Sequence, residues 1–295
     1  MSGILVLGGA GQLALSLKER AEAQGLALRF AGRPDADLAD ADSLRATVAR
    51  HRPESIVNAA AYTQVDGAED DPALARRLNA EGPAALAEAA REAGARLIHV
   101  STDYVFDGSG ERPWAEEDRP NPQSVYGRTK LEGEEAVRAV CPAHVIVRTA
   151  WVYSPFGVNF VRTMLNLARA RPSLAVVADQ FGNPTSALDL ADGLLTVLRA
   201  WDKEPELGLG STYHLAGQGA TDWATFARAI FAISKARGGP SASVDSITSA
   251  EWPARAARPK NSRLETDRFA ATFGYRAPPW GDSLPPVVER LLAEP

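Results

Sequence analysis

The chain has 295 residues, of which 45% are hydrophobic and 23% charged, and its formal net charge is −5. This composition excludes a disordered protein, because the apolar content is enough to bury a large core. The acidic balance argues against a nucleic-acid partner, which would need a basic face for its phosphates, but a small anionic ligand needs only one local basic pocket.

Cysteine content and apolar runs bear on where the protein works. The single cysteine, Cys141, cannot form an intramolecular disulfide, and no cysteine–histidine cluster has the spacing of zinc ligands. The apolar run Ile4–Leu7 has no basic region before it and ends at two glycines, unlike a secretory signal. No apolar stretch approaches the roughly 18 residues that a membrane helix needs. We therefore expect a cytoplasmic protein in a reducing compartment, with no membrane partner.

Short apolar runs alternate with longer helical patterns through the first half of the chain. The runs typical of strands are residues 4–7, 26–30, 55–58, 96–101 and 144–148. The patterns long enough for helices are residues 13–24, 43–51, 72–93 and 126–140. This alternation predicts right-handed β-α-β units, and hence a parallel sheet with helices on both faces.

Beyond about residue 150, prolines, tryptophans and longer loops become more frequent. Helical patterns continue at residues 159–169, 188–201 and 222–236, and residues 212–215 could return a strand to the sheet. We predict an α/β fold with a Rossmann-type doubly wound parallel sheet. Residues 1–150 would form this nucleotide-binding domain, and residues 151–295 a smaller C-terminal lobe that mainly binds substrate.

A glycine-rich turn lies between the first predicted strand and the first predicted helix. Gly8, Gly9 and Gly11 permit a tight turn and let backbone N–H groups approach a pyrophosphate at the positive end of a helix. This context favours a dinucleotide site over a plain turn. Asn58 and the alanines Ala59–Ala61 follow another strand, where small side chains would let a flat cofactor lie against the backbone, although core packing explains the alanines nearly as well.

Tyr126 and Lys130 are four residues apart, so on a helix they share one face. We expect the ammonium to lower the pKa of the phenol, which is ordinarily near 10, and to make Tyr126 a proton donor at neutral pH. Thr102 ends the predicted strand before them and could hydrogen-bond a substrate carbonyl, while Lys130 could also reach a cofactor ribose. A tyrosine–lysine pair alone is common on solvated helices, but the glycine turn and Thr102 favour the catalytic interpretation.

With these motifs the chain resembles the extended short-chain dehydrogenase/reductases and, among them, the dTDP-4-dehydrorhamnose reductases. The resemblance extends nearly from end to end. The segments that carry it are Gly8–Gln12, Val57–Glu69, Leu78–Ala80, Ser101–Phe106, Val125–Lys130, Arg148–Tyr153, Asp179–Thr185 and Arg258–Leu264.

The resemblance implies reduction of the 4-keto group of a nucleotide-linked sugar, dTDP-4-dehydro-L-rhamnose, by hydride from a nicotinamide. Tyr126 would protonate the developing alkoxide, Lys130 would lower its pKa and hold the ribose, and Thr102 would orient the carbonyl. The implied substrate-binding residues are Thr102, Asp103, Trp151 and Arg258. The implied cofactor-binding residues are Gly8, Gly11, Gln12, Leu13, Arg33, Asp37, Leu38, Ala59, Ala60, Ala61, Thr63, Tyr126 and Lys130. Without the resemblance, Trp151 could be a core aromatic and Arg258 part of a solvated basic run.

Two other functions stay open. The superfamily also contains nucleotide-sugar epimerases and 4,6-dehydratases, and a dehydratase would have an aspartate–glutamate pair after the threonine. Here Tyr104 follows Asp103, so elimination is disfavoured. Other proteins with this fold are non-catalytic NADP-binding regulatory subunits, which often lack the tyrosine–lysine pair that is intact here.

The residues after the second predicted strand bear on the choice of cofactor. NAD-specific folds usually place an acidic residue there to hold the ribose 2′-hydroxyl. Here Gly32 and Arg33 follow the strand, with no carboxylate until Asp35, and Arg33 could pair with a 2′-phosphate. We expect NADPH to be preferred and NADH also to be accepted.

Metal binding and assembly are expected to differ from some relatives, which the resemblance associates with a homodimer bridged by Mg²⁺ on glutamates. Ser16 and Leu188 occupy the aligned positions, and neither can replace a carboxylate ligand. Asp189 is adjacent but would point about 100° away on a helix. We expect no metal, activity without divalent cations, and a monomer or a metal-independent homodimer.

Overall fold

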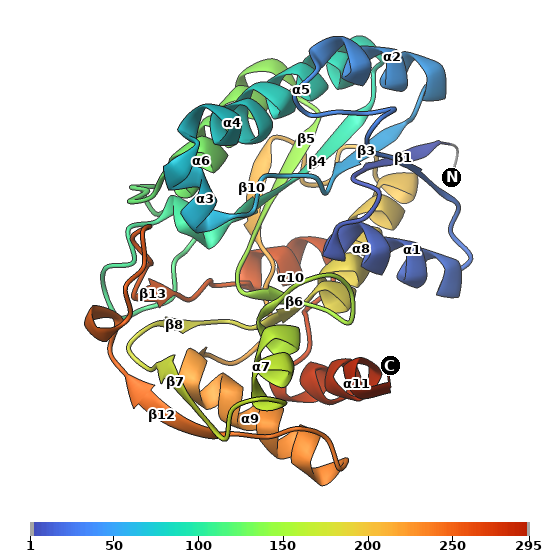
Figure 1. Cartoon of the computed structure of the whole chain (residues 1–295). Helices are drawn as coiled ribbons and strands as arrows, with labels where there is room; N and C mark the ends of the chain where they lie inside the picture. The colour runs from blue at the N-terminus through green and yellow to red at the C-terminus, as the bar shows by residue number, and fades with distance from the viewer. Residues whose placement is uncertain (1–2, 294–295) are drawn as a thin grey trace.

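The computed structural model describes residues 3–293, within which six strands form one parallel sheet (Figure 1). In spatial order these strands are β10 (Ser211–His214), β5 (His144–Thr149), β4 (Arg96–Thr102), β3 (Ser55–Asn58), β1 (Ile4–Leu7) and β2 (Leu28–Ala31). Every neighbouring pair is parallel, so the carboxyl ends of all six strands meet at one edge. The order reverses between β1 and β3, the point at which open parallel sheets bind ligands. The predicted fold class is confirmed.

Alternate residues of the strands enter separate cores on the two faces of the sheet. Ile4 and Val6 of β1 enter one core, and Leu5 and Leu7 enter the other. The helices on the first face are α1 (Gln12–Ala23), α8 (Ala187–Lys203) and α10 (Asp267–Phe273), and those on the second are α2 (Ala41–His51), α5 (Gly82–Glu92) and α6 (Val125–Val140). Continuous apolar runs are what strands covered on both faces require. Among residues 3–293, no helix combines the length and apolarity needed to cross a membrane.

The helical pattern of residues 72–93 forms three segments rather than one helix. They are α4 (Pro72–Arg76), the π-helical turn η1 (Arg77–Glu81) and α5, and the short α3 (Val65–Asp70) precedes them. Pro83 accounts for the break, because it has no N–H for the carbonyl of Asn79 four residues earlier. That carbonyl lies against Gly133 of α6, where a Cβ would come within 2.1 Å of it.

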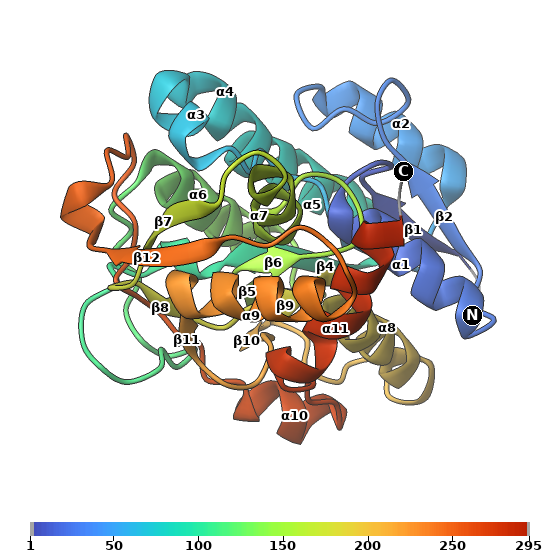
Figure 2. The ribbon, with the colours of Figure 1, turned by 60° about the horizontal axis from the view of Figure 1, so that its bottom comes forward.

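A third core defines what we call the small lobe. It contains α7 (Phe160–Ala168), α9 (Trp223–Ala236), α11 (Trp280–Ala293) and β7 (Ser173–Val177), which pairs with β12 (Ser243–Ile247). Figure 2 shows β7 and β12 side by side over α9. The remaining strands form two short sheets, β11 (Thr221–Asp222) with β8 (Phe181–Gly182) and β13 (Asn261–Ser262), and β6 (Val152–Tyr153) with β9 (Thr185–Ser186). Single-turn 3₁₀ helices η2 (Asp103–Val105) and η3 (Ser249–Glu251) complete the described elements.

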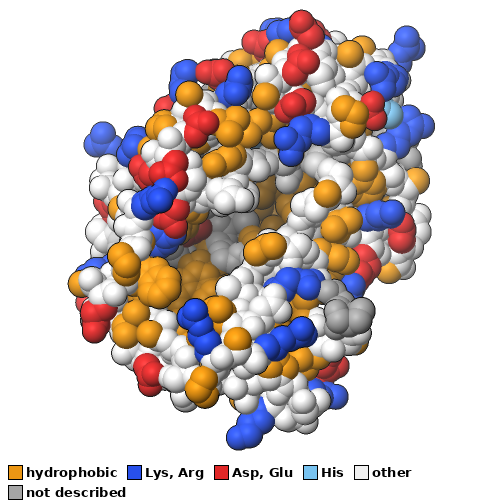
Figure 3. Space-filling model, in the orientation of Figure 1, with side chains coloured by type: hydrophobic (Ala, Val, Ile, Leu, Met, Phe, Trp, Pro, Cys, Tyr) orange, Lys and Arg blue, Asp and Glu red, His pale blue; other side chains and the backbone are white. Residues whose placement is uncertain are grey.

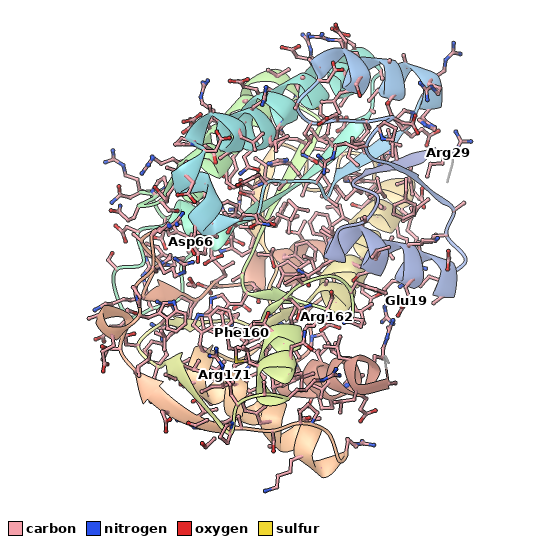
Figure 4. All side chains as sticks on the ribbon, viewed as in Figure 1. Glu19, Arg29, Asp66, Phe160, Arg162 and Arg171 are labelled. Carbon is pink, nitrogen blue, oxygen red and sulfur yellow. The ribbon has the colours of Figure 1, made fainter. Side chains whose placement is uncertain are left out.

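The chain after residue 150 also contributes to the main sheet. β10 pairs with β5, as predicted for the returning strand at residues 212–215, and α8 packs on α1. Arg20 of α1 forms an ion pair with Asp192 of α8. Glu19, also on α1, accepts two hydrogen bonds from Arg290 of α11 at 2.7 and 2.9 Å, which joins the small lobe to the same helix (Figure 4).

A buried ion pair fastens α6 to β5. The carboxylate of Glu134 accepts hydrogen bonds from Nε and Nη2 of Arg148 at 2.9 and 2.7 Å, and neither side chain is more than 2% exposed. Arg138 donates to the same carboxylate at 2.7 Å. Burial alone would raise the pKa of Glu134, but the charges of Arg148 and Arg138 and the hydrogen bonds to the carboxylate together outweigh it and hold the pKa at about 2. Removing Glu134 would therefore leave the charge of Arg148 uncompensated in the core.

We expect Glu134→Gln to lower the free energy of unfolding at pH 7 by about 3–5 kcal/mol, the usual cost of breaking a buried pair from one side. Urea denaturation followed by circular dichroism measures the change. Arg45→Ala is the control, since the exposed Arg45 pairs with Asp42 and Glu88 and should cost less than about 1 kcal/mol. Equal losses in the two variants would contradict the assignment.

Candidate active site

The glycine turn after β1 leaves open backbone at the start of α1. Gly8 has φ 110°, a conformation that favours glycine. A Cβ at Gly9 or Gly11 would have nothing within 4 Å. Gly11 is the N-cap residue of α1, and no side chain caps this end. The first N–H groups of α1 are therefore available to an anion.

The segment after β3 lies against this turn, so the structure brings Gly8 and the predicted alanines together. A Cβ at Gly8 would be 3.4 Å from the backbone nitrogen of Ala60. The Asn58 side chain accepts a hydrogen bond from that nitrogen at 3.3 Å and lies 3.1 Å from Nδ1 of the buried His99. Asn58 thus fixes the path of the backbone between β3 and the exposed Ala61, with His99 supporting it.

Two predicted cofactor-binding side chains at the start of α1 face away from the glycine turn. Oε1 of Gln12 accepts a hydrogen bond from Ser154 at 2.9 Å, and Nε2 donates to the carbonyl of Val158 at 3.4 Å. Leu13 is buried in the core between α1 and the sheet. Gln12 therefore joins α1 to the chain that leads into the small lobe, and Leu13 can offer only its backbone to a cofactor.

The loop after β2 passes beside the glycine turn. A Cβ at Gly32 would be 2.9 Å from the backbone nitrogen of Gly9, and the adjacent Arg33 is exposed. Further along, Asp37 accepts a hydrogen bond from the backbone of Ala39 at 2.9 Å, and Leu38 is buried. Arg33 thus lies near the turn, while Asp37 and Leu38 shape the loop. Thr63, predicted for the same cofactor, is exposed between β3 and α3.

The three predicted catalytic residues meet at the carboxyl end of β4, and all are buried. Thr102 ends β4, and its side chain is hydrogen-bonded to the hydroxyl of Tyr126 at the start of α6. Lys130, one turn further along α6, donates a hydrogen bond from Nζ to the carbonyl of Val100 at 2.8 Å. Both groups on α6 therefore face the same strand, as their spacing predicts.

Burial, rather than the proximity of Lys130, sets the pKa of Tyr126. It raises this pKa to about 12, and the hydrogen bond with Thr102 offsets only part of the effect. Burial also lowers the pKa of Lys130 to about 8, against the opposing charge of Glu134. The predicted lowering of the tyrosine pKa is therefore wrong for the ligand-free site. The free energy lost when a phenolate is removed from water is larger than the stabilisation that the neighbouring groups give it. Tyr126 is neutral at neutral pH, the state that a proton donor needs.

Asp103 directly follows Thr102 and is 3% exposed. Its Oδ1 accepts the hydroxyl hydrogen bond of Thr102 at 3.0 Å. Burial raises the pKa of Asp103 to about 6, with hydrogen bonds from Ser262 and Thr102 opposing the rise.

Trp151 lies at the same edge of the sheet, just after β5. Thr149, the last residue of β5, is directly opposite Thr102 in the register of the two strands. Trp151 has φ 48°, which is rare for a bulky residue, and its indole stacks on Trp223 with ring centroids 3.5 Å apart and planes 10° apart. Trp151, the predicted sugar contact, therefore follows a strand that ends opposite Thr102, and Trp223 covers one face of its ring.

Arg258 is held by an acidic partner rather than lying in a free basic run. Its guanidinium donates to both carboxylate oxygens of Asp66 on α3, at 2.9 and 2.6 Å. The hydrogen bond from Arg258 lowers the pKa of Asp66 to about 2. A second ion pair joins Arg255 to Asp70 at the other end of α3. These pairs tie the chain around residue 258 to α3, where Figure 4 labels Asp66.

The positions considered for magnesium have other roles in the structure. Ser16 donates a hydrogen bond to the backbone carbonyl of Gln12 at 2.8 Å, and Asp189 accepts one from Ser283 at 2.5 Å. Leu188 is half-buried at the start of α8. Across residues 3–293, no group of three histidine, cysteine, aspartate or glutamate side chains is arranged to hold a metal ion.

The face that Figure 3 presents is hollowed at its centre, and hydrophobic side chains line part of the hollow. The glycine turn, the alanines, Thr102 and Trp151 all follow the carboxyl ends of parallel strands, so they belong to one edge of the sheet. Chemically, this edge can hold a pyrophosphate at the start of α1. It can also present a neutral phenol and a threonine hydroxyl to a carbonyl oxygen, which suits proton donation rather than proton removal.

The sequence alone gave no role to Asp66, Ser262 or Trp223. Asp66 and Ser262 lie inside segments that carry the family resemblance, so the available signal was their membership of those segments. Trp223 lies outside all of them, and no spacing along the chain relates it to Trp151. Only the packing of the small lobe brings these two side chains together.

Comparison with known proteins gives a consistent result. The family model described as the RmlD substrate binding domain matches residues 1–293. The chain is 45% identical over 291 residues to the dTDP-4-dehydrorhamnose reductase of Sinorhizobium fredii (strain NBRC 101917 / NGR234), covering 99% of this chain and 98% of that protein.

Two solved structures of proteins with that name are also similar. The structure from Clostridium acetobutylicum ATCC 824 has a TM-score of 0.90 at 37% identity and covers 98% of this chain and 99% of its own. The structure from Bacillus anthracis str. Ames, in complex with NADP, has a TM-score of 0.89 at 32% identity and covers 100% of both chains.

The raised pKa of Asp103 predicts a pH-dependent cost to stability. The folded-state pKa of about 6 lies above the ordinary value of 3.8, so the folded state binds more protons between these values and stability falls as pH rises through them. We expect Asp103→Asn to gain stability relative to the wild type over this range, approaching about 3 kcal/mol above pH 6. Denaturant unfolding of both proteins from pH 4 to pH 7.5 measures the difference.

Asp66→Asn is the matched control for Asp103→Asn. Asp66 has its pKa lowered to about 2, so its contribution is present above pH 3.8 and is lost only as pH falls toward 2. The stability difference for this variant should therefore be flat from pH 4 to pH 7.5. A flat difference for Asp103→Asn as well would show that Asp103 titrates normally.

Proposed function

The chain belongs to the family of the RmlD substrate binding domain, and we propose that it is an NADPH-dependent dTDP-4-dehydrorhamnose reductase. It reduces the C4 keto group of dTDP-4-dehydro-L-rhamnose to the hydroxyl of dTDP-L-rhamnose. The observation that carries the proposal is the neutral phenol of Tyr126, bonded to Thr102 and one helical turn from Lys130, at the sheet edge that also holds the open glycine turn.

The residues of this edge fit a nicotinamide dinucleotide. The uncapped start of α1 and the open Gly9 and Gly11 suit a pyrophosphate, and Ala59–Ala61 leave space for a flat group. Lys130 would hold the ribose, with Gln12 and Leu13 contributing backbone. Bound NADPH supplies the hydride that the reduction requires. Arg33 would meet a 2′-phosphate, and the rest of the proposed set is Asp37, Leu38 and Thr63.

Tyr126 provides the proton for the C4 oxygen. In the ligand-free site its hydroxyl is hydrogen-bonded with the side chain of Thr102, and a bound carbonyl oxygen would accept the proton of the phenol instead. When C4 gains the hydride, its oxygen becomes an alkoxide, which is a much stronger base than a phenolate. The proton therefore moves from Tyr126 to the C4 oxygen even though burial raises the tyrosine pKa. Thr102 would orient the carbonyl for this transfer by turning its hydroxyl proton from Asp103 to the carbonyl oxygen.

Lys130 stabilises the phenolate that this transfer leaves behind. Its pKa of about 8 keeps most of the group charged at neutral pH, and the Val100 carbonyl holds Nζ in place. The positive charge is one turn from Tyr126 on the same helix face. The interaction between Lys130 and Tyr126 is therefore weak while Tyr126 is neutral and becomes strongly favourable as the phenolate forms. A contact of this kind stabilises the transition state more than the ground state.

Trp151, Asp103 and Arg258 form the proposed substrate-binding set together with Thr102. Arg258 is suited to a diphosphate because a guanidinium binds phosphate and carboxylate oxygens in the same forked geometry. In the ligand-free protein Asp66 takes that place. The diphosphate of the nucleotide sugar would therefore exchange with Asp66 or share Arg258 with it.

The alternatives differ from this proposal in the acid–base groups they need. A 4,6-dehydratase would need a second acid after Asp103, but Tyr104 lies there and burial raises its pKa above the usual range. A regulatory subunit would not need the buried Tyr126–Thr102 contact. The proposal also includes no metal and no nucleic-acid or membrane partner. It leaves the assembly as a monomer or a metal-independent homodimer, since Ser16 and Leu188 cannot replace carboxylates.

We expect Tyr126→Phe to lower kcat by about 10²-fold or more, the usual scale of general acid catalysis, with little change in substrate KM. The assay follows NADPH oxidation with enzymatically prepared dTDP-4-dehydro-L-rhamnose, in EDTA and again in excess Mg²⁺, and identifies the sugar product. Tyr213→Phe, which removes a hydroxyl from the core below β10, should stay within about twofold of wild type. Turnover of Tyr126→Phe near the wild-type rate would refute the role of Tyr126, and a different product would refute the proposed function.

Arg33 is expected to favour NADPH over NADH. We expect Arg33→Ala to lower kcat/KM for NADPH by about tenfold, the low end for a hydrogen bond to a charged group, and to leave NADH within about twofold. Arg29→Ala is the control, because Arg29 is exposed on β2 (Figure 4) and carries the same charge. An equal loss with both cofactors, or the same loss in Arg29→Ala, would count against Arg33.

A further inference from the structure

The backbone of Trp151 needs support from its surroundings. Its φ of 48° is one of two positive values at non-glycine residues between 3 and 293, the other being Arg52 at the end of α2. A bulky side chain keeps this conformation only where packing holds it. The carbonyl of Trp151 accepts a hydrogen bond from the N–H of Thr185 at 3.1 Å.

Gly182 of β8 covers one face of the Trp151 indole. A Cβ at Gly182 would come within 2.5 Å of Cε2, 2.7 Å of Nε1 and 2.9 Å of Cδ2 of the indole. These three atoms surround the ring fusion, so the missing Cβ would lie over the ring face and not beside its edge. Gly182 has no positive φ, so the indole is what excludes a side chain there.

Trp223 covers the opposite face. Its ring is parallel to the Trp151 ring within 10° at a centroid distance of 3.5 Å, and the space over the other face belongs to Gly182. Trp223 is itself fixed at the first turn of α9, where Asp222 accepts a hydrogen bond from the N–H of Thr225 at 2.8 Å. Phe160 of α7, labelled in Figure 4, packs on Trp223 at 4.5 Å.

With both faces covered, the indole of Trp151 has only its edge left for a ligand. Within the part of the chain that the structure describes, its N–H makes no hydrogen bond, and Trp151 is only half-buried. An indole N–H is a donor only, and a sugar hydroxyl or carbonyl is a suitable acceptor. The clamp therefore determines which edge of the ring a sugar meets and at what angle.

We propose that Trp223 is a positioning residue for substrate binding, which with Gly182 clamps Trp151 so that the indole meets the sugar by its edge. The inference rests on the proposed function, in which Trp151 contacts the sugar. It adds a role for two residues outside the proposed substrate-binding set, Trp223 from α9 and Gly182 from β8. Both belong to the packing between the small lobe and the sheet edge.

Two variants perturb the clamp from opposite sides. Trp223→Leu removes the stacked ring, and Gly182→Ala pushes a methyl group into the other face of the indole. We expect each to raise KM for the nucleotide sugar by about five- to tenfold, the scale of an aromatic pair, with kcat and the KM for NADPH within about twofold. Trp223→Phe keeps an aromatic face and should restore most of the affinity.

Circular dichroism reports the clamp without any ligand, because two stacked indoles couple and give a paired exciton band. The band should disappear in Trp223→Leu and weaken in Gly182→Ala. Trp201→Phe is the matched control, since Trp201 is a buried tryptophan in the core below the sheet and makes no contact with this stack. It should leave the exciton band and both KM values unchanged, even if it lowers stability.

A double-mutant cycle separates positioning from general damage. If Trp223 acts through Trp151, Trp223→Leu should have little further effect on the sugar KM in a Trp151→Leu background. Additive losses in the cycle, or loss of the exciton band with an unchanged sugar KM, would overturn the proposal while leaving the proposed function intact. A wild-type protein that fails to turn over dTDP-4-dehydro-L-rhamnose would overturn both.

Discussion

The pairing of Glu134 with Arg148 fixes the helix that carries the proton donor against the strand that leads to the sugar contact. Glu134 lies one turn beyond Lys130 on α6, and Arg148 lies three residues before Trp151 at the end of β5. Neither charge reaches water, so a shift of α6 along the sheet would leave Arg148 unpaired in the core. One buried contact thus constrains the spacing of Tyr126, Lys130 and Trp151 more tightly than hydrophobic packing alone, which tolerates sliding.

Local chemistry made much of the fold and the centre of the site predictable. A parallel strand covered on both faces must read as an apolar run, and a four-residue spacing places Tyr126 and Lys130 on one face of whatever helix they share. Which side chains become buried, by contrast, cannot be read from the neighbouring sequence. The reversed pKa direction of Tyr126, the partner of Arg258 and the stack on Trp151 all depend on which distant segments close over a residue. Pro83 was visible in the sequence, but its consequence, the π-helical turn, depends on how the Asn79 carbonyl packs against α6.

Contacts between the lobes involve residues that the sequence associates with ligands. Gln12 follows the glycine turn, yet its side chain bonds the chain leading into α7. Arg258 is a proposed diphosphate ligand, yet it is paired with Asp66 on α3. Both side chains therefore join segments that are distant in the sequence in the ligand-free protein. A ligand at either end of the site would compete with these contacts, so its binding free energy would be coupled to the relative position of the joined segments.

The dry environment of Tyr126 and Lys130 determines what kind of catalyst the pair can be. Burial disfavours the phenolate and the ammonium alike, so it raises one pKa and lowers the other. A resting phenolate–ammonium pair would suit proton removal, whereas a neutral phenol beside a mostly charged lysine suits proton donation. The same exclusion of water strengthens the attraction between Lys130 and a phenolate once one forms. The desolvation that opposes charge in the resting site therefore increases the stabilisation available when the alkoxide takes the proton, and this argues for reduction as the direction the site favours.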